Sequence, residues 1–121
     1  MKTILIVEDT ELNIDLMTQL LEDDYNLIFA NDGEQGVVLA NEKTPDLILM
    51  DITLPVMDGY EATRKIRETL KSVPIIGLSA HAMNGHEAMA KEAGCDDYLT
   101  KPVDDRLLFK MLEKYLGGTE S

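Results

Sequence analysis

The feature that most constrains the fold of this sequence is a regular alternation between short apolar runs and longer segments with helical periodicity. The apolar runs are "TILIV" (3–7), "NLIFA" (26–30), "DLILM" (46–50), "PIIGLS" (74–79) and "DYLT" (97–100). Each run is too short for a core helix, and its Ile, Val and Leu content is typical of strands that are buried on both faces. The sequence therefore predicts five core strands.

Helical periodicity follows each of these runs. The predicted helices cover residues 10–23, 33–43, 58–70, 84–93 and 104–116. The first places the apolar residues Leu12, Leu16, Met17, Leu20 and Leu21 on one broad face. In the third, the charges of "RKIRE" are expected to face water.

The predicted fourth helix is poorly anchored. Its stretch "AMNGHEAMAKEAG" offers small apolar residues and few large ones. Gly85 either lies inside the helix, at a cost of about 1 kcal/mol relative to alanine, or starts it with Asn84 as the cap. We expect this helix to be the loosest of the five.

A strand followed by a helix, repeated five times, predicts one parallel sheet with right-handed crossovers and helices on both faces. The 121 residues suffice for one domain with its own core. We expect that domain to span residues 1–116, with residues 117–121, "GGTES", as a flexible C-terminal tail.

Composition limits the possible partners. The chain has 11 Lys and Arg against 23 Asp and Glu, a formal charge of -12, which disfavours nucleic acid and anionic lipid and favours cations or a basic protein surface. No apolar run is long enough to span a bilayer, and no signal peptide begins the chain. The single cysteine, Cys95, fits a reducing compartment and a semi-buried apolar role. We expect a cytoplasmic protein.

Polar residues follow the predicted strands at the ends where a doubly wound sheet binds ligands. Glu8 and Asp9 follow the first strand, Asp51 the third and Lys101 the fifth, and Ser79 ends the fourth. Parallel strands bring these ends to one edge of the sheet, so the five side chains are expected to converge there.

Each of these residues also has a structural interpretation. Asp9 or Thr10 could cap the first helix, Ser79 could simply end a strand, and Lys101 could be solvated. Convergence favours function, because neighbouring buried carboxylates repel each other and a divalent cation relieves that repulsion. Since no His or Cys lies at these strand ends, oxygen ligands predict Mg²⁺ rather than Zn²⁺.

This set of residues favours phosphoryl chemistry. An aspartate can act as a nucleophile and form an acyl phosphate, and Asp51 is the central candidate. Glu8 and Asp9 would hold the metal, Lys101 would neutralise the phosphoryl oxygens together with it, and Ser79 would donate a hydrogen bond to one of them.

Four segments together resemble the receiver domain of two-component response regulators. They are "ILIVEDTELN", "PDLILMDITLPVMDGYEATRKIR", "PIIGLSAHAM" and "AGCDDYLTKP", and they occur in that order over essentially the whole chain. The resemblance implies a flavodoxin-like, doubly wound (βα)5 fold with the five-stranded parallel sheet in the order 2-1-3-4-5.

The resemblance also implies roles for individual residues. Asp51 matches the phosphoacceptor, and Glu8 and Asp9 match the acidic pair, with Asp9 the more direct metal ligand. The backbone carbonyl of Thr53 matches a further metal ligand. Many relatives have Asp at the position of Glu8, which we expect to alter the metal geometry slightly.

Three further positions match the switching apparatus of the family. Ser79 matches the switch hydroxyl and Tyr98 the switch aromatic that rotates inward when Ser79 moves. Lys101 matches the phosphate-binding lysine, and its bond to Pro102 is expected to be cis.

The implied function is a signalling switch without enzymatic turnover of a substrate. Its donor would be the phosphohistidine of a sensor histidine kinase or of a histidine phosphotransfer protein, with Mg²⁺ as cofactor and Mn²⁺ able to replace it. Its output would be an altered contact between a downstream protein and the face formed by the fourth helix, the fifth strand and the fifth helix. The segment "SAHAM" favours a phosphorelay.

Other classes fit less well. A phosphatase of the haloacid dehalogenase kind needs a second aspartate where this chain has Thr53, and a flavin mononucleotide binder needs a phosphate-cradling loop in place of "EDTELN". The intact acid set argues against a receiver that no longer takes phosphate. His81 and His86 have no partner at a metal-ligand spacing and are interpreted as non-catalytic, and Asn13 as a hydrogen-bonded structural residue.

Overall fold

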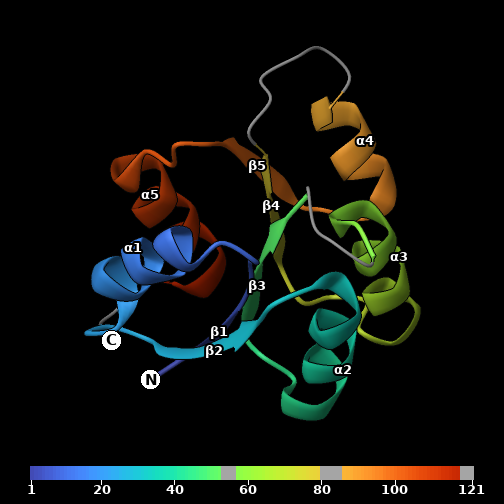
Figure 1. Ribbon diagram of the computed structural model, residues 1–121, viewed down its shortest axis with the longest axis horizontal. Coiled ribbons are helices and arrows are strands. Elements are labelled where there is room, and N and C mark those ends of the chain that lie inside the picture. The colour runs from blue at the N-terminus through green and yellow to red at the C-terminus, as the bar shows by residue number, and fades with distance from the viewer. Residues whose placement is uncertain (53–56, 80–85, 118–121) are drawn as a thin grey trace.

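The computed structural model describes residues 1–52, 57–79 and 86–117 of the chain (Figure 1). Its strands are β1 (Thr3–Val7), β2 (Asn26–Ala30), β3 (Leu47–Asp51), β4 (Ile75–Ser79) and β5 (Asp97–Thr100). Its helices are α1 (Glu11–Leu21), α2 (Gly33–Lys43), α3 (Gly59–Thr69), α4 (His86–Ala93) and α5 (Asp105–Leu116). Every predicted strand and helix is present, with ends shifted by at most two residues.

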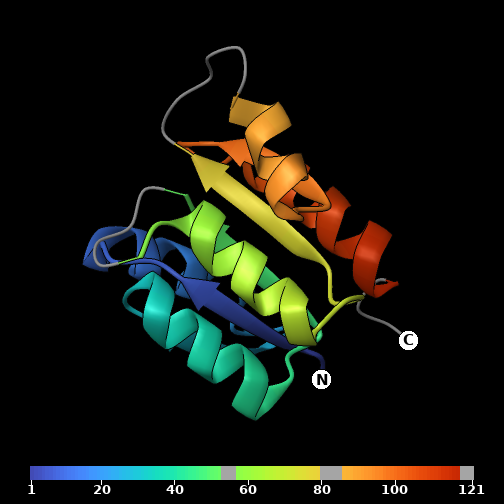
Figure 2. The same ribbon diagram turned by 90° about the vertical axis from the view of Figure 1, so that its right-hand side faces the viewer.

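The five strands form one parallel sheet in the order β2-β1-β3-β4-β5, as predicted. Helices α1 and α5 cover one face of the sheet, and α2, α3 and α4 cover the other (Figures 1 and 2). The molecule therefore has three layers, and all five strands run with their carboxyl ends at the same edge of the sheet.

The sheet separates two apolar clusters. Successive side chains of a strand point to opposite faces, so Ile4 and Ile6 pack against α1 and α5, whereas Leu5 and Val7 pack against α2 and α3. Residues Ile4–Val7 of β1 and Leu47–Met50 of β3 are completely buried. Burial on both faces holds for β1, β3 and β4 only, because β2 and β5 lie at the sheet edges and are half-exposed there.

The apolar face predicted for the first helix is narrower in the structure. Met17 and Leu21 are buried, whereas Leu12 is 65% exposed and Leu16 is 49% exposed. A helix turns by about 100° per residue, so the row of Leu12 and Leu16 is rotated away from the row of Met17 and Leu21 that meets the sheet. Only part of the broad apolar face predicted for this helix therefore meets the sheet.

The expectation that all charges of "RKIRE" face water was also wrong. Arg64 and Lys65 are exposed, but the Arg67 side chain is only 18% exposed. Its guanidinium lies at the end of the sheet opposite to the carboxyl ends, where carbonyl groups need donors. A charged residue near the end of a helix can turn inward when it finds acceptors there.

Helix α4 has the sparse anchorage that its sequence predicts. Ala90 and Ala93 are buried, and Met89, a larger apolar residue, is 50% exposed. That α4 is the loosest helix stays a prediction, and Asn84 and Gly85 lie outside the described residues. Within the described part of the chain, no helix is both long and apolar enough to cross a membrane.

Candidate metal and phosphoryl site

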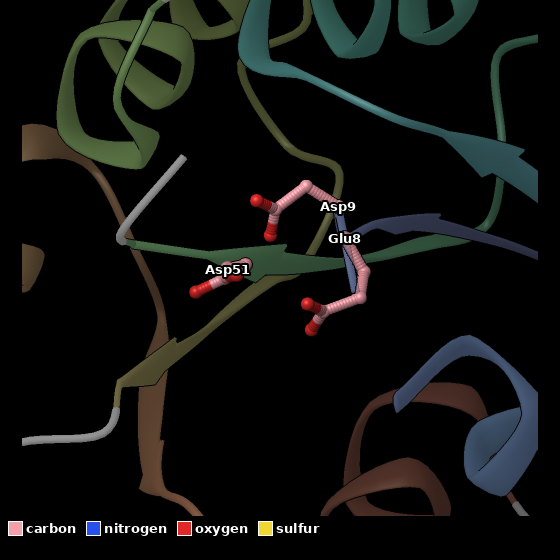
Figure 3. A group of neighbouring side chains, drawn as sticks. All are labelled: Glu8, Asp9 and Asp51. Atoms are coloured by element: carbon pink, nitrogen blue, oxygen red, sulfur yellow. The ribbon is translucent and has the colours of Figure 1, made fainter. Parts of the chain in front are cut away.

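Three carboxylates meet at the carboxyl ends of β1 and β3. Glu8, Asp9 and Asp51 each offer an oxygen, and these oxygens all lie within 4.8 Å of one another. Figure 3 shows the three side chains gathered at the ends of the two neighbouring strands. The structure therefore brings together the three acids that the sequence nominated.

Buried strands fix the position of these acids. Glu8 directly follows the buried residues of β1, and its backbone N–H donates to the Ala30 carbonyl of β2 at 2.9 Å. Asp51 is the last residue of β3 and is only 3% exposed. Since both strands are buried along their length, neither carboxylate can move far without disturbing the core.

Lys101 reaches into the same group of carboxylates. Its Nζ lies 2.9 Å from Oε1 of Glu8 and 3.2 Å from Oδ2 of Asp51. The peptide bond between Lys101 and Pro102 is cis, as expected, and the Lys101 backbone N–H donates to the Ser79 carbonyl at 2.6 Å. Lys101 therefore bridges two of the acids instead of being solvated.

The second oxygen of Glu8 is also occupied. Oε2 accepts hydrogen bonds from the backbone N–H of Thr10 at 3.2 Å and from Nδ2 of Asn13 at 3.4 Å. This contact confirms the structural interpretation of Asn13. Glu8 is thus held by three donors, and it in turn holds Lys101.

The charges of Glu8 and Lys101 determine the protonation state of each side chain. Burial opposes ionisation of Glu8, but the hydrogen bond and charge of Lys101, with the two donors on Oε2, outweigh it, so the pKa of Glu8 is lowered. Burial likewise opposes the charge of Lys101, and Glu8 and Asp51 overcome this and raise the pKa of the ammonium. Glu8 and Lys101 are therefore an ion pair at neutral pH.

Helix capping does not account for the acids after β1. Thr10 occupies the N-cap position of α1 but makes no capping hydrogen bond through its side chain. By contrast, Asp32 caps α2 by accepting from Gln35, and Asp58 caps α3. Asp9 is exposed at the rim of the site. The structure therefore does not support the interpretation of Asp9 or Thr10 as a side-chain cap of α1.

Ser79 lies at this edge of the sheet, and Tyr98 lies further back on the neighbouring strand β5, where it pairs with Gly77. Ser79 is 1% exposed and ends β4, the strand next to β3. Tyr98 is half-buried in β5 and packs against the apolar cluster on the α2, α3 and α4 side. The switching roles assigned to them stay predictions, and Thr53 and His81 lie outside the described residues.

The carboxylates suit a magnesium ion. Mg²⁺ binds oxygens at about 2.0–2.1 Å, so opposite ligands lie about 4 Å apart, close to the spread of the three acids. Lys101 pairs with both Glu8 and Asp51, but Thr10 and Asn13 also occupy the second oxygen of Glu8, so Glu8 is the acid least available to a metal. Water would complete the coordination, as is usual for Mg²⁺.

A groove of about 450 Å³ opens beside the site, between α1 and the start of α5. Glu8 and Lys101 line it together with Leu16, Leu20 and Val103. Sequence reasoning missed this groove because it placed the leucines of α1 on one broad apolar face together with Met17. Their spacing of four residues was the available signal, since it forms a second apolar row beside that of Met17.

Comparison with known proteins shows the family to which this chain is similar. Residues 4–113 match the response regulator receiver domain. The chain is 40% identical over 119 residues to the polar-differentiation response regulator DivK of Brucella ovis, covering 96% of this chain and 97% of that protein.

Solved structures agree in fold. A receiver domain of a sensor histidine kinase from Pseudomonas aeruginosa, with a magnesium ion coordinated in its active-site cleft, is 39% identical. It has a TM-score of 0.89 and covers 97% of this chain and 98% of that chain. The receiver domain of Ssk1 from Saccharomyces cerevisiae, solved with the histidine phosphotransfer protein Ypd1, is 31% identical with a TM-score of 0.88, covering 94% of this chain and 88% of that one.

Proposed function

This chain belongs to the response regulator receiver family, a family of signalling modules, and from that premise we propose that Asp51 is its phosphoacceptor. The observation that carries the proposal is the convergence of Glu8, Asp9, Asp51 and Lys101 at one edge of the sheet. Three acids and one partly buried ammonium form a site for a divalent cation and a phosphoryl group.

In the proposed reaction, a carboxylate oxygen of Asp51 attacks the phosphorus of a phosphohistidine. The new O–P bond forms as the P–N bond breaks, and the imidazole leaves as a neutral group after it takes up a proton. Asp9, Asp51 and Glu8 would hold Mg²⁺. We expect Mn²⁺ to be able to replace it. The metal, when bound, neutralises charge on the transferred oxygens.

Side chains of this protein would bind and orient the transferred phosphoryl group. Lys101 already lies within hydrogen-bonding distance of Asp51, so it meets a phosphoryl oxygen on that carboxylate without a large movement. Glu8 holds Lys101 in place at 2.9 Å. The hydroxyl of Ser79, at the end of the neighbouring strand, donates to another phosphoryl oxygen, and the backbone carbonyl of Thr53 serves as a further metal ligand.

The donor is a sensor histidine kinase or a histidine phosphotransfer protein, and the groove beside α1 supports this choice. Its apolar wall, with Leu16 and Leu20, leads directly to Glu8 and Lys101, so a partner seated there could present an imidazole to Asp51. The chain has no lysine or arginine from Thr3 to Glu42. The expected partner surface is therefore apolar with basic residues around it.

The proposed output is a change in the protein contacts of the face formed by α4, β5 and α5. Phosphorylation draws Ser79 towards the phosphoryl group, and Tyr98 follows into the space that it leaves. Sparse anchorage of α4, through Ala90 and Ala93, favours a rearrangement of this face. Signalling then depends on a downstream protein in the same compartment, which we propose is the cytoplasm.

The proposal is tested by phosphorylation with acetyl phosphate and Mg²⁺. The intact mass should rise by one phosphoryl group, and Asp51→Asn should abolish the increase. Asp15→Asn, an exposed aspartate on α1, is the matched control and should label like the parent. Labelling that persists in Asp51→Asn would move the acceptor elsewhere, and steady turnover of a phosphomonoester would favour a phosphatase instead.

A further inference from the structure

The side chain of Asn13, on α1, makes one of the contacts that hold the carboxylate of Glu8. Its Nδ2 donates to Oε2 of Glu8 at 3.4 Å, and the backbone N–H of Thr10 donates to the same oxygen at 3.2 Å. Glu8 is only 1% exposed, so water does not readily replace a donor that is lost. Because a buried carboxylate oxygen without a donor is costly, these two contacts restrict the orientation of Glu8.

The other oxygen of Glu8 is linked to the proposed phosphoacceptor through Lys101. Oε1 accepts from Nζ of Lys101 at 2.9 Å, and the same Nζ lies 3.2 Å from Oδ2 of Asp51. The two oxygens of a carboxylate are rigidly joined, so a rotation that moves Oε2 also moves Oε1. The contacts therefore form a chain from Asn13 through Glu8 and Lys101 to Asp51.

We infer that Asn13 is a positioning residue for the phosphoryl site, an inference that rests on the proposed function of Asp51. Asn13 holds Oε2 of Glu8 towards α1. This leaves Oε1 directed at Lys101 and keeps the ammonium next to Asp51. Asn13 acts through Glu8 and needs no contact of its own with the phosphoryl group.

The contact with Glu8 also accounts for the residue type at this position. Asparagine is a poorer helix former than leucine or alanine, and residue 13 lies inside α1 instead of at its cap. Among the residues that the structure describes, the side chains that donate to Glu8 are those of Lys101 and Asn13. Asn13 therefore supplies the side-chain donor for the second oxygen of this carboxylate.

Loss of the Asn13 amide should slow phosphorylation without weakening metal binding. Oε2 would keep only its backbone donor, so Glu8 could rotate and Lys101 would spend less time beside Asp51. A hydrogen bond to a charged group contributes about tenfold at the low end, and 3.4 Å is long for such a bond, so we expect a fall in rate of about fivefold. Mg²⁺ affinity should stay the same or rise, because a carboxylate that loses a donor is a better ligand for a cation.

The first experiment compares the parent chain with Asn13→Leu and with Asn41→Leu as the matched control. Asn41 lies near the end of α2, where its Nδ2 donates to the Val37 carbonyl at 2.9 Å. Asn13 borders the groove beside α1, so a leucine of similar size there does not displace the core. Isothermal titration with MgCl₂ gives the affinity, and the time course of intact mass with acetyl phosphate at saturating Mg²⁺ gives the rate.

We expect Asn13→Leu to be labelled about fivefold more slowly than the parent, with a parental or tighter Mg²⁺ affinity. Asn41→Leu should match the parent in both measurements. Parental labelling of Asn13→Leu, or a loss of rate that weaker Mg²⁺ binding fully explains, overturns the positioning role and leaves the proposed function intact.

A double-mutant cycle with Glu8→Ala separates action through Glu8 from a general loss of structure. In the Glu8→Ala background, Asn13→Leu should slow labelling by less than about twofold, because the carboxylate that Asn13 positions is gone. An equal effect of Asn13→Leu in both backgrounds shows that Asn13 acts independently of Glu8 and overturns the inference.

Two further outcomes are decided by the same measurements. If Asn13→Leu shows no cooperative melting, Asn13→Ala, which removes the amide without adding volume, is judged by the same criteria. A parent chain that is not labelled at Asp51 refutes the proposed function, and the positioning role with it.

Discussion

Replacing Arg67 with methionine should destabilise the protein strongly, although Arg67 lies far from the acidic site. Its Nε donates to the Gly94 carbonyl at 2.9 Å, and its Nη1 donates to the carbonyls of Leu70 at 3.2 Å and Val73 at 2.6 Å. Its Nη2 pairs with Asp96 at 2.7 Å. One side chain therefore satisfies acceptors from the end of α3, the turn before β4 and the turn before β5.

The expected loss of stability follows from the acceptors that the substitution leaves without a donor. Methionine keeps most of the aliphatic stem and removes all the donors, so three carbonyls lose a partner. An acceptor left unsatisfied in a buried place costs about 1–3 kcal/mol, and the low end applies here because Arg67 is 18% exposed and water can enter. The ion pair adds little, since the Asp96 side chain is 41% exposed. The expected loss in free energy of unfolding is about 3 kcal/mol.

Urea unfolding followed by circular dichroism measures this loss. The midpoint should fall by about 1.5 M with an unchanged slope, and Tm should fall by about 10 °C for a domain of this size. Arg64→Met, at an exposed position in the same helix, is the matched control and should change stability by less than about 0.5 kcal/mol. An Arg67→Met variant as stable as Arg64→Met would refute the argument from unsatisfied carbonyls.

Three further predictions concern the ionisable side chains of Lys101 and Cys95. Lys101→Met leaves Glu8 and Asp51 without their shared cation, so the metal-free Tm of this variant should fall. Added Mg²⁺ should raise its Tm by more than it raises the Tm of the parent or of the exposed control Lys114→Met. Equal increases in Tm in all three proteins would contradict this prediction. Burial raises the pKa of the Cys95 thiol to about 11. At pH 8 its thiolate fraction is therefore about a hundredfold below that of an ordinary thiol. A disulfide reagent should react with the native chain at least that much more slowly than with the urea-unfolded chain. The same raised pKa favours the native state at neutral pH, and this contribution should be lost as the pH rises from 9 towards 11; equal reaction rates in the two states would show that Cys95 is neither buried nor shifted.

The surroundings of Glu8 differ from those of Asp9. Both oxygens of Glu8 accept hydrogen bonds, from Lys101 on one side and from Thr10 and Asn13 on the other. Asp9 is exposed, and in the described part of the chain its side chain accepts only from the hydroxyl of Thr10, at 3.5 Å. This asymmetry is consistent with the resemblance, which makes Asp9 the more direct metal ligand of the acidic pair.

The order of the elements and the members of the acidic site could be read from the sequence. Runs such as "LILM" before Asp51 have the length and composition of buried strands, and the spacing of the helices between them requires parallel strands. In a parallel sheet, residues that follow the strands share one edge whatever the details of packing. Glu8, Asp9, Asp51 and Lys101 could therefore be grouped before any distance was known.

Only the tertiary structure decided how each side chain is used. The exposure of Leu16, the inward turn of Arg67 and the close approach of Gly33 to Met57 depend on the rotation of each helix and on segments distant in sequence. Local periodicity records which residues are apolar and how they repeat, and it therefore determines the strands, the helices and the sheet edge. It carries no record of which backbone atom a neighbouring segment will bring within a few ångströms, because that distance is fixed by the packing of the whole core.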